Sequence, residues 1–461
     1  MKRNAIKLVF VSMLMVLAIN AFAGSLDTLS NQSAAYLFDT AQNASTDGAG
    51  IVPYNPAGTA LLDKGFYLDV SNQTLLKFYS QSEDVLLKDT YELNAPTPFL
   101  PNMFLAYNFG ILGAGKLSVY GQAGVCAGGG SLPWEDGTVG TNGFAASGAG
   151  DTADQLTTGG IATSATGYSS TLEGSSIYYG LGAGVGYSLF DDKLSASAGV
   201  RYTMAERSAK ISGTMNFYTA AFGPNANWSV DIVDDYEYSA AGFTPIFGLD
   251  IRPVDKLTIG VRYEMETELE FDYKTNEIGA TPSTVNPGTT PAATGIAAGL
   301  PNYDGTSANQ NLPQVISVGA EYVFSPKFTA SAGSTFYLMS NADLEGGEDG
   351  YGLGFELSAS AKYQATDKLM LGGTFMHTRQ AVEDSLWEDD GDALLTVSGN
   401  PPLDSMYFGL GCEYAVLKNV DLVLGGTYVY YLPEDITTDG GMEVSYEKTV
   451  INLGIGVKCK L

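Results

Sequence analysis

The stretch "KLTIGVRYEMETELEFDY", Lys256 to Tyr273, alternates between apolar and polar residues over almost its whole length. One set of alternate positions is apolar: Leu257, Ile259, Val261, Tyr263, Met265, Leu269, Phe271 and Tyr273. The other set contains Thr258, Gly260, Arg262, Glu264, Glu266, Glu268, Glu270 and Asp272. A period of two predicts a β-strand with one apolar and one polar face. In a soluble protein the apolar face would be the core, whereas in a membrane barrel it faces lipid.

The same alternation recurs along the chain and predicts an all-β protein. Fourteen strands are predicted, at residues 65–79, 99–110, 115–127, 172–189, 193–217, 236–252, 256–276, 312–324, 327–340, 351–364, 368–380, 404–416, 421–432 and 442–461. Their connections alternate between tight turns and longer loops, which is typical of an outer-membrane barrel with an even strand number. Closure also pairs every strand edge, as hydrocarbon requires. We therefore predict a 14-stranded antiparallel transmembrane β-barrel over residues 65–461.

The first 23 residues have the pattern of a secretory signal peptide. Lys2, Arg3 and Lys7 precede an apolar run of about a dozen residues, and Ala21-Phe22-Ala23 forms a small-x-small cleavage signal before Gly24. The apolar run is too short for a membrane helix, which needs about 20 apolar residues. Residues 1–23 are thus predicted to be removed on export.

The chain is strongly acidic, with a formal net charge of −28. Such a chain cannot bind nucleic acid by neutralising phosphates. The acidic clusters at residues 231–238, 343–350 and 383–392 are interpreted as solvated loops; a divalent cation is the alternative, because paired carboxylates suit hard cations. None of the three matches a calcium-binding loop, and we expect neither a metal nor a cofactor.

Residues for catalysis are few. Cys126, Cys412 and Cys459 are too scattered for a disulfide framework or a zinc site, and we interpret them as small apolar strand residues. The single histidine, His377, lies in the strand pattern "GGTFMHTRQ" without a nucleophile beside it. We therefore expect no catalytic residue and no enzyme activity.

The segment before the first strand, residues 24–64, includes the turn-rich apolar stretch "DGAGIVPYNPAGTALL", Asp47 to Leu62. A barrel of this size has a lumen that must be filled or must conduct water. The segment is better suited to folding inside that lumen than to lying free in water. Pro53 and Pro56 fix the backbone of its turn, and Asn55 can hydrogen-bond nearby backbone groups.

The stretch "NQSAAYLFDTAQNASTDGAGIVPYNPAGTALL", Asn31 to Leu62, resembles the N-terminal hatch of the FadL family of outer-membrane long-chain fatty acid transporters. The family's Asn-Pro-Ala turn is matched by Asn55, Pro56 and Ala57. The segments "PNMFLAY" from Pro101, "ELEFDYKTN" from Glu268 and "LPQVISVGAEYVFSPKFT" from Leu312 are similar in the same order. The resemblance implies a barrel plugged by the hatch, capture of an apolar ligand at the outer face, and a kink in strand three that opens sideways into the membrane.

Glycines mark two strands of the predicted wall. Strand three, "LSVYGQAGVCAGGG", could bend at its five glycines, or these could simply ease barrel curvature; they are Gly121, Gly124, Gly128, Gly129 and Gly130. Strand four places another set on its inward face, where they leave lumenal space: Gly180, Gly182, Gly184 and Gly186.

Three arginines have inward parity and are candidates for binding a ligand carboxylate: Arg201, Arg207 and Arg262. Arg207 lies in "ERSAKI", which is similar to the family's Arg-x-Lys-Ile stretch carrying a carboxylate contact. The alternative is that the arginines pair with lumenal acids such as Glu264 and Glu266. Ligand capture is expected in the loop from Gly140 to Ser170.

The resulting hypothesis is a channel in the outer membrane of a Gram-negative-type bacterium for passive uptake of hydrophobic small molecules, in particular long-chain fatty acids. Its expected partners are the ligand, outer-membrane lipid and lipopolysaccharide, and the barrel-assembly machinery, and we expect a monomer. Three alternatives remain open: an aromatic hydrocarbon channel, a structural or adhesive surface barrel that uses its acidic loops, and an outer-membrane hydrolase that uses His377.

Overall fold

The computed structural model describes residues 33–84, 87, 89–284, 289–298, 300, 302–344, 348–383, 399–437 and 441–461. The predicted signal peptide and the first residues of the expected hatch lie outside these ranges. So does nearly all of the acidic cluster at residues 383–392.

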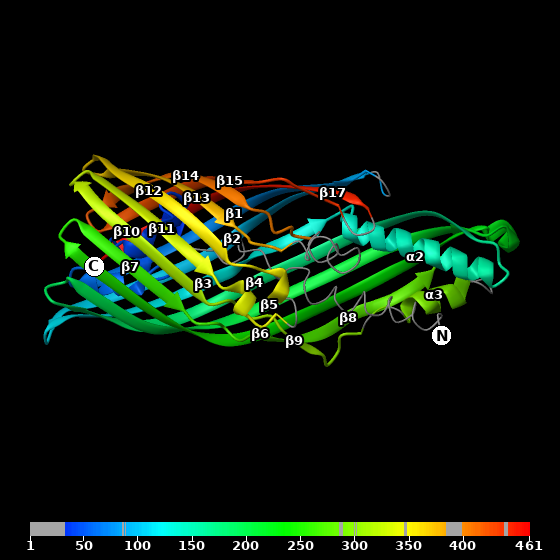
Figure 1. Cartoon of the computed structure of the whole chain (residues 1–461), viewed down its shortest axis with the longest axis horizontal. Helices are drawn as coiled ribbons and strands as arrows, with labels where there is room; N and C mark the ends of the chain where they lie inside the picture. Colours follow the sequence, from blue (N-terminus) through cyan, green and yellow to red (C-terminus); the bar gives the residue numbers. More distant parts are fainter. Residues whose placement is uncertain are drawn as a thin grey trace.

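The strands form one antiparallel sheet that closes on itself, because β1 pairs with both β2 and β17 (Figure 1). The strands are β1 (Gly65–Glu83), β2 (Asp89–Leu112), β3 (Gly115–Trp134), β4 (Ser164–Leu189), β5 (Leu194–Tyr218), β6 (Asn227–Val254), β7 (Leu257–Glu264), β8 (Glu270–Pro282), β9 (Ser307–Asn309), β10 (Val315–Ser325), β11 (Phe328–Tyr337), β12 (Gly354–Thr366), β13 (Leu369–Arg379), β14 (Ser405–Leu417), β15 (Val420–Tyr431), β16 (Glu434–Thr437) and β17 (Glu443–Lys460). β7 and β8 are two parts of one wall strand, and β9 and β16 are short additions. The predicted closed barrel of 14 strands is confirmed.

The tight turns lie at one end of the barrel, and several strands project well beyond the others at the opposite end (Figure 1). The projecting end carries α2 (Val139–Thr158) and α3 (Thr289–Ala297), and the 3-10 helices η6 (Ala220–Asn225), η7 (Met339–Asn341) and η8 (Glu348–Gly350) lie in the long connections. In the part of the chain that is described, no helix is long and apolar enough to cross a membrane.

The predicted capture loop, residues 140–170, contains regular structure that the sequence analysis did not foresee. Residues 139–158 form α2, which begins with a capping box in which the side chains of Thr138 and Thr141 each accept from the other's backbone N–H. β4 already begins at Ser164, eight residues before its predicted start. The many small residues that suggested a loop instead let α2 pack closely on the strand extensions, where Ala149 and Ala153 are buried.

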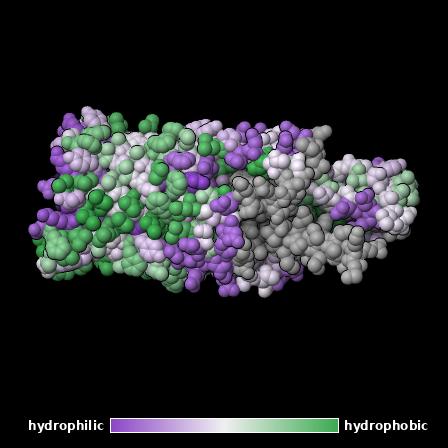
Figure 2. Space-filling model, in the orientation of Figure 1, coloured by the Kyte–Doolittle hydropathy of each residue, from purple (hydrophilic) through white to green (hydrophobic). Residues whose placement is uncertain are grey.

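The outer surface of the barrel is apolar. Figure 2 shows hydrophobic residues gathered over the barrel wall, bordered by polar residues near the tight turns and toward the projecting end. Large exposed hydrophobic side chains include Leu181, Val185, Leu410, Leu453 and Ile455. Closed backbone pairing with an apolar exterior is the arrangement that hydrocarbon selects.

The prediction that one face of residues 257–273 is apolar throughout is wrong. Met265 is exposed on the outer surface, yet Leu269, Phe271 and Tyr273 are buried inside. β6 pairs Ile246 with Glu264 in β7 but Ser239 with Asp272 in β8, so the wall strand holds one extra residue between these pairs. A one-residue insertion turns every following side chain to the other face. The apolar face therefore points outward in β7 and inward in β8.

Residues 33–62 lie inside the barrel as a compact plug. They form η2 (Ala34–Leu37), η3 (Gln42–Ala44), η4 (Ala49–Ile51) and η5 (Pro56–Leu61), and almost every side chain is buried. η2 contacts β14, β15 and β17, η3 contacts β7, β10 and β11, and η5 contacts β3 to β6. Glycines of the wall make room for it: a Cβ on Gly260 would lie 1.8 Å from the Asn43 carbonyl oxygen, and one on Gly409 1.9 Å from that of Leu37.

Candidate functional site

The Asn55-Pro56-Ala57 turn fastens the plug to the barrel wall. Asn55 caps η5 by accepting a hydrogen bond from the Ala57 N–H at 3.2 Å. Its Nδ2 lies 2.7 Å from Asp250 Oδ1 and 3.1 Å from the Leu249 carbonyl oxygen, both on β6. Ser195 on β5 donates to the Ala57 carbonyl at 3.0 Å. Pro53 is half-buried, whereas Pro56 and Ala57 are buried within the turn. The turn thus has the backbone role predicted for it and, in addition, direct contacts with the wall.

A cavity lies between the plug and the wall, and we call it the hatch cavity; it encloses about 1040 Å³ including its open mouth. Tyr36 and Tyr54 of the plug line it and stack on each other, with ring centroids 5.5 Å apart. Burial raises the pKa of both phenols well above the usual value, so they stay protonated.

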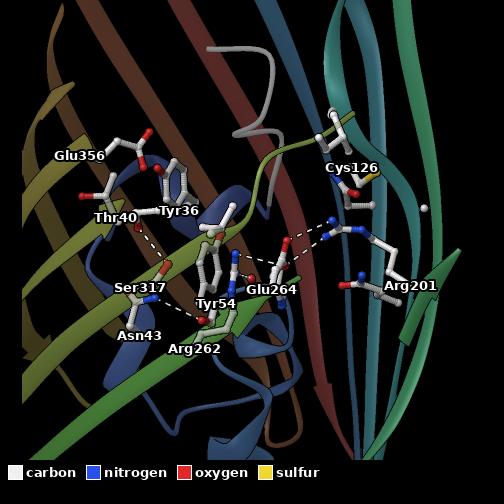
Figure 3. A pocket seen from close by; sticks show the side chains of 18 of the residues that line it. Tyr36, Thr40, Asn43, Tyr54, Cys126, Arg201, Arg262, Glu264, Ser317 and Glu356 are labelled. Carbon is white, nitrogen blue, oxygen red and sulfur yellow. Dashed lines mark hydrogen bonds and ion pairs between the residues drawn. The ribbon is translucent and has the colours of Figure 1, made fainter. Parts of the chain in front are cut away.

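Two of the three predicted arginines line the hatch cavity and share one carboxylate (Figure 3). Arg201 binds Glu264 with two hydrogen bonds, at 3.2 and 3.0 Å, and Arg262 Nη2 lies 3.1 Å from Glu264 Oε1. Arg262 also donates to the Pro53 carbonyl oxygen of the plug. Arg201 and Arg262 thus pair with a lumenal acid, which was the alternative to binding a ligand carboxylate. Glu266, the other acid considered for such pairing, instead accepts a hydrogen bond from Asn311.

Glu264→Gln is expected to lower the free energy of unfolding by about 3 kcal/mol, because the guanidinium groups of Arg201 and Arg262, whose side chains are 14% and 11% exposed, would lose their shared countercharge. The measurement is urea unfolding of the barrel in lipid vesicles. Glu237→Gln is the matched control, since Glu237 pairs with Lys274 on the exposed surface, and such pairs contribute about 0–1 kcal/mol. Equal losses in the two variants would show that the Glu264 cluster adds no more than a surface pair.

Arg207 lies apart from the other two, in a cluster of aromatic rings, and is 3% exposed. Its guanidinium carbon is 5.0 Å from the centroid of Tyr238 and 5.7 Å from that of Phe271. This aromatic cluster consists of Tyr236, Tyr238, Phe271, Tyr273 and Tyr303. Arg207 Nη1 donates to Gln310 Oε1. Within the described residues no carboxylate pairs with Arg207, and its Nε and Nη2 have no hydrogen-bond partner.

The barrel wall is interrupted between β2 and β3. The two strands pair from Leu112 and Gly115 up to Asn102 and Gly124, and over their described remainders β2 pairs with β1 while β3 pairs with β4. We call this unpaired stretch the seam. β3 is also irregular against β4, with register shifts on either side of Ala127.

The five predicted glycines of β3 divide between the two interpretations. Gly128 and Gly130 have φ of +92° and +72° beside the seam, a conformation that favours glycine. Gly124 has positive φ where the ladder with β2 ends, and Gly129 has open space where a Cβ would stand. Gly121 lies in the regular ladder, as expected of a glycine that only eases packing. In β4 a Cβ on Gly186 would meet Ser118 and Thr59, so these inward glycines do leave lumenal space.

A second cavity, here the seam cavity, adjoins the seam and encloses about 940 Å³ with its open mouth. It shares Tyr36, Glu356 and Met376 with the hatch cavity, so the two adjoin. Gly129 and Gly130 line it, and Lys77 on β1 reaches into it. Sequence reasoning missed Lys77. The signals that could have revealed it are a lysine at an inward position of β1 and the three prolines of β2, Pro96, Pro98 and Pro101, which cannot donate to a neighbouring strand and mark an edge.

The three cysteines and the single histidine lie on strands of the wall, and Cys126 also lines the hatch cavity. The three cysteines are free, and His377 lies on β13 with Nδ1 3.1 Å from the Ser405 carbonyl oxygen. Near the tight turns, Lys362 of β12 lies 3.0 Å from Asp39 and 3.1 Å from Asp47 of the plug. The fold and these contacts define a plugged β-barrel with two adjoining internal cavities, one of which meets an interruption in the wall.

Solved structures with a similar fold include a FadL homologue and two toluene transporters. A FadL homologue from Pseudomonas aeruginosa superimposes with a TM-score of 0.63 at 14% identity, covering 95% of this chain and 99% of that one. The toluene transporter TodX of P. putida gives 0.60 at 12% identity (94% and 99% covered), and the toluene transporter TbuX of Ralstonia pickettii gives 0.52 at 13% (95% and 100%). No protein-family model matches the sequence, and no curated protein is significantly similar to it. The resemblance of the hatch to the FadL family is thus matched by the fold of the whole chain.

Proposed function

We propose that this protein is an outer-membrane channel of the FadL family for passive uptake of hydrophobic small molecules, and of long-chain fatty acids in particular. The observation that carries the proposal is Arg207, a buried guanidinium with unused donors and no carboxylate partner among the described residues. An uncompensated buried charge is costly. A ligand carboxylate would neutralise it, and the surrounding apolar and aromatic side chains would receive the chain of the ligand.

The route that we propose begins at the projecting end, near α2, and passes Arg207 to the hatch and seam cavities. Arg207 pairs in register with Ser176 of β4, which itself lines the seam cavity. Burial of the tail would drive capture, at about 0.8 kcal/mol per methylene group. The ligand would leave sideways through the seam into the membrane, so that no energy source is required.

Movement of the plug is proposed to gate the passage between the two cavities. Tyr36 of η2 lines both cavities and stacks on Tyr54, the residue before Asn55. Polar contacts with the wall run along the whole plug, and those of Asn55 hold the turn next to this tyrosine pair. A small shift at the Asn55 turn would therefore change both cavities without unfolding the barrel.

Aromatic hydrocarbon uptake is the second candidate. The stacked rings around Tyr238, with centroids 4.9 Å apart for Tyr238 and Tyr273, offer faces on which an aromatic ring could pack. In this case Arg207 would act through its cation–π contacts and would need no anion. The two candidates differ in whether a charged head group matters.

Arg207→Ala is expected to reduce uptake of labelled oleate strongly in cells that lack their own fatty acid channel and express this protein. The reason is the loss of the only proposed charge contact within the aromatic cluster. Arg379→Ala is the matched control, because Arg379 is exposed at the end of β13, and both variants are compared at equal outer-membrane levels. If Arg207→Ala left oleate uptake unchanged, Arg207 would not be the carboxylate contact. No uptake by the inserted wild-type barrel would favour aromatic hydrocarbons, tested with toluene, or a surface role.

A further inference from the structure

Lys77 is a buried ammonium group inside the barrel wall. The residue is 3% exposed, and its Nζ donates to the carbonyl oxygens of Gly129 at 2.7 Å and Ser131 at 2.6 Å. Among the described residues no carboxylate forms an ion pair with it. Two neutral carbonyl groups only partly replace water around a full charge, so the site keeps the capacity to bind an anion.

The surroundings of Lys77 suit the head of an amphiphile. The seam cavity around it is lined by apolar side chains that include Leu75, Leu132 and Val450. A second cation, Lys448 on the adjacent strand, lies over the rings of Tyr79 and Tyr431, at 4.9 and 4.4 Å from their centroids. Of these two cations Lys77 lines the cavity, and Glu356 lines it on the side shared with the hatch cavity. The cavity therefore combines an apolar volume with a positive charge beside the seam, which is the combination that a long-chain carboxylate requires.

The carbonyl groups that Lys77 binds lie at the end of the irregular part of β3: Gly129 is inside it, and Ser131 follows where the ladder with β4 has resumed. The β3–β4 ladder skips from Ala127 to Gly130, and the β2–β3 ladder has already ended at Gly124. Thr97 of β2 also donates to the Gly129 carbonyl, at 3.0 Å. Side chains of β1 and β2 thus hold this edge of β3 where no backbone ladder joins it to β2.

We propose that Lys77 is an anion-binding residue at the seam, which receives the carboxylate of a long-chain monocarboxylic acid before it leaves the barrel. The inference rests on the proposed function and deepens it, because it assigns a second charge contact on the exit side of the plug. An ammonium group has three donors. Binding the carboxylate draws Lys77 from Gly129 and Ser131, which frees the bent part of β3 as the ligand arrives. A neutral ligand of the same length gains nothing from this contact.

The test compares uptake of labelled oleate and labelled oleyl alcohol, whose chains are alike and whose heads differ in charge. Cells without their own fatty acid channel express wild type, Lys77→Met, Lys77→Arg or Lys327→Met. Lys327 lies exposed in a tight turn and serves as the matched control. Loss of a charged hydrogen bond predicts that Lys77→Met slows oleate uptake about tenfold or more. Lys77→Arg keeps most oleate uptake, and oleyl alcohol uptake is unchanged or faster in every variant.

Three results would overturn the inference. Unchanged oleate uptake in Lys77→Met would remove Lys77 from the route while leaving the proposed function intact. An equal loss of oleate and oleyl alcohol uptake in Lys77→Met, with gel mobility showing a folded barrel, would mean that Lys77 only stabilises β3 and binds no ligand. Wild-type cells that take up neither ligand would refute the proposed function and this inference together. If Lys77→Met fails to insert into the membrane, the ratio of oleate uptake to oleyl alcohol uptake in Lys77→Arg decides. A ratio equal to that of wild type supports the inference, and a lower ratio overturns the inference.

Discussion

Oxidised T97C/G130C is expected to take up oleate no faster than cells without the channel, and reduction is expected to restore uptake. Thr97 on β2 and Gly130 on β3 face each other across the seam, and a Cβ on Gly130 would lie 3.3 Å from the Thr97 Cβ. Disulfides join Cβ atoms about 3.5–4.5 Å apart, so a small adjustment suffices. The bond would hold β3 against β2 where no backbone ladder joins them, and so close the proposed sideways exit.

Each single variant, T97C and G130C, is the control for the double variant. G130C carries the same strain, because Gly130 has φ of +72° and a side chain there costs about 1–2 kcal/mol. The free cysteines Cys126, Cys412 and Cys459 are present in all three proteins, so a mispaired disulfide would appear in the single variants as well. Wild-type uptake by a fully oxidised double variant would place the exit elsewhere, with passage through the plug as the remaining route.

The barrel was predictable because its rule is local. Each wall strand repeats an alternation that the sequence displays directly, and tight turns separate the strand pairs. The inward position of Arg201, Arg207 and Arg262 follows from the same parity. Arg201 and Arg262 line the hatch cavity, and Arg207 is buried among the aromatic rings. The final strand is a clear case, since Leu453, Ile455 and Val457 are exposed to the outside as alternation requires.

The features that escaped prediction depend on partners distant in sequence. One extra residue between Glu264 and Asp272 reverses the faces of β8, and only the pairing with β6 reveals it. Glu264 unites Arg201 and Arg262 because β5 and β7 both flank β6, which the alternation of a single strand does not show. In the sequence, Lys77 is a lysine at an inward position of a strand, with nothing to distinguish it. Its contacts with the carbonyl groups of β3 depend on the gap between β2 and β3, which only the structure shows.

The contact between plug and wall depends on space as much as on hydrogen bonds. Asn43 of η3 packs its backbone against Gly260 of β7 and its side chain against Gly319 and Gly333 of β10 and β11. Any side chain at these wall positions would occupy the volume of the plug itself. Glycines of the wall therefore leave the volume that the plug occupies. Adding one side chain at such a position should displace the plug while the barrel stays folded.

Gly260→Ala is expected to displace η3 and make the barrel permeable to small hydrophilic solutes. The added methyl group would lie 1.8 Å from the Asn43 carbonyl oxygen, a distance that no relaxation of a side chain can relieve. The barrel itself should remain folded, since its ladders involve backbone groups that the substitution leaves in place. Permeability is measured by entry of a hydrophilic dye into vesicles that contain the purified protein, and folding by gel mobility with and without heating.

Gly426→Ala is the matched control, because a Cβ on Gly426 would make ordinary contacts, at 3.5 Å from Leu453 and 3.9 Å from the Asn452 carbonyl oxygen. It should leave the vesicles as tight as wild type does. Dye entry confined to Gly260→Ala would show that the plug seals the lumen and can move while the wall stays closed, which is the property that gating by the plug requires. Tight vesicles with folded Gly260→Ala would mean that the plug shifts without opening a path for water, so that the seam alone would have to control passage.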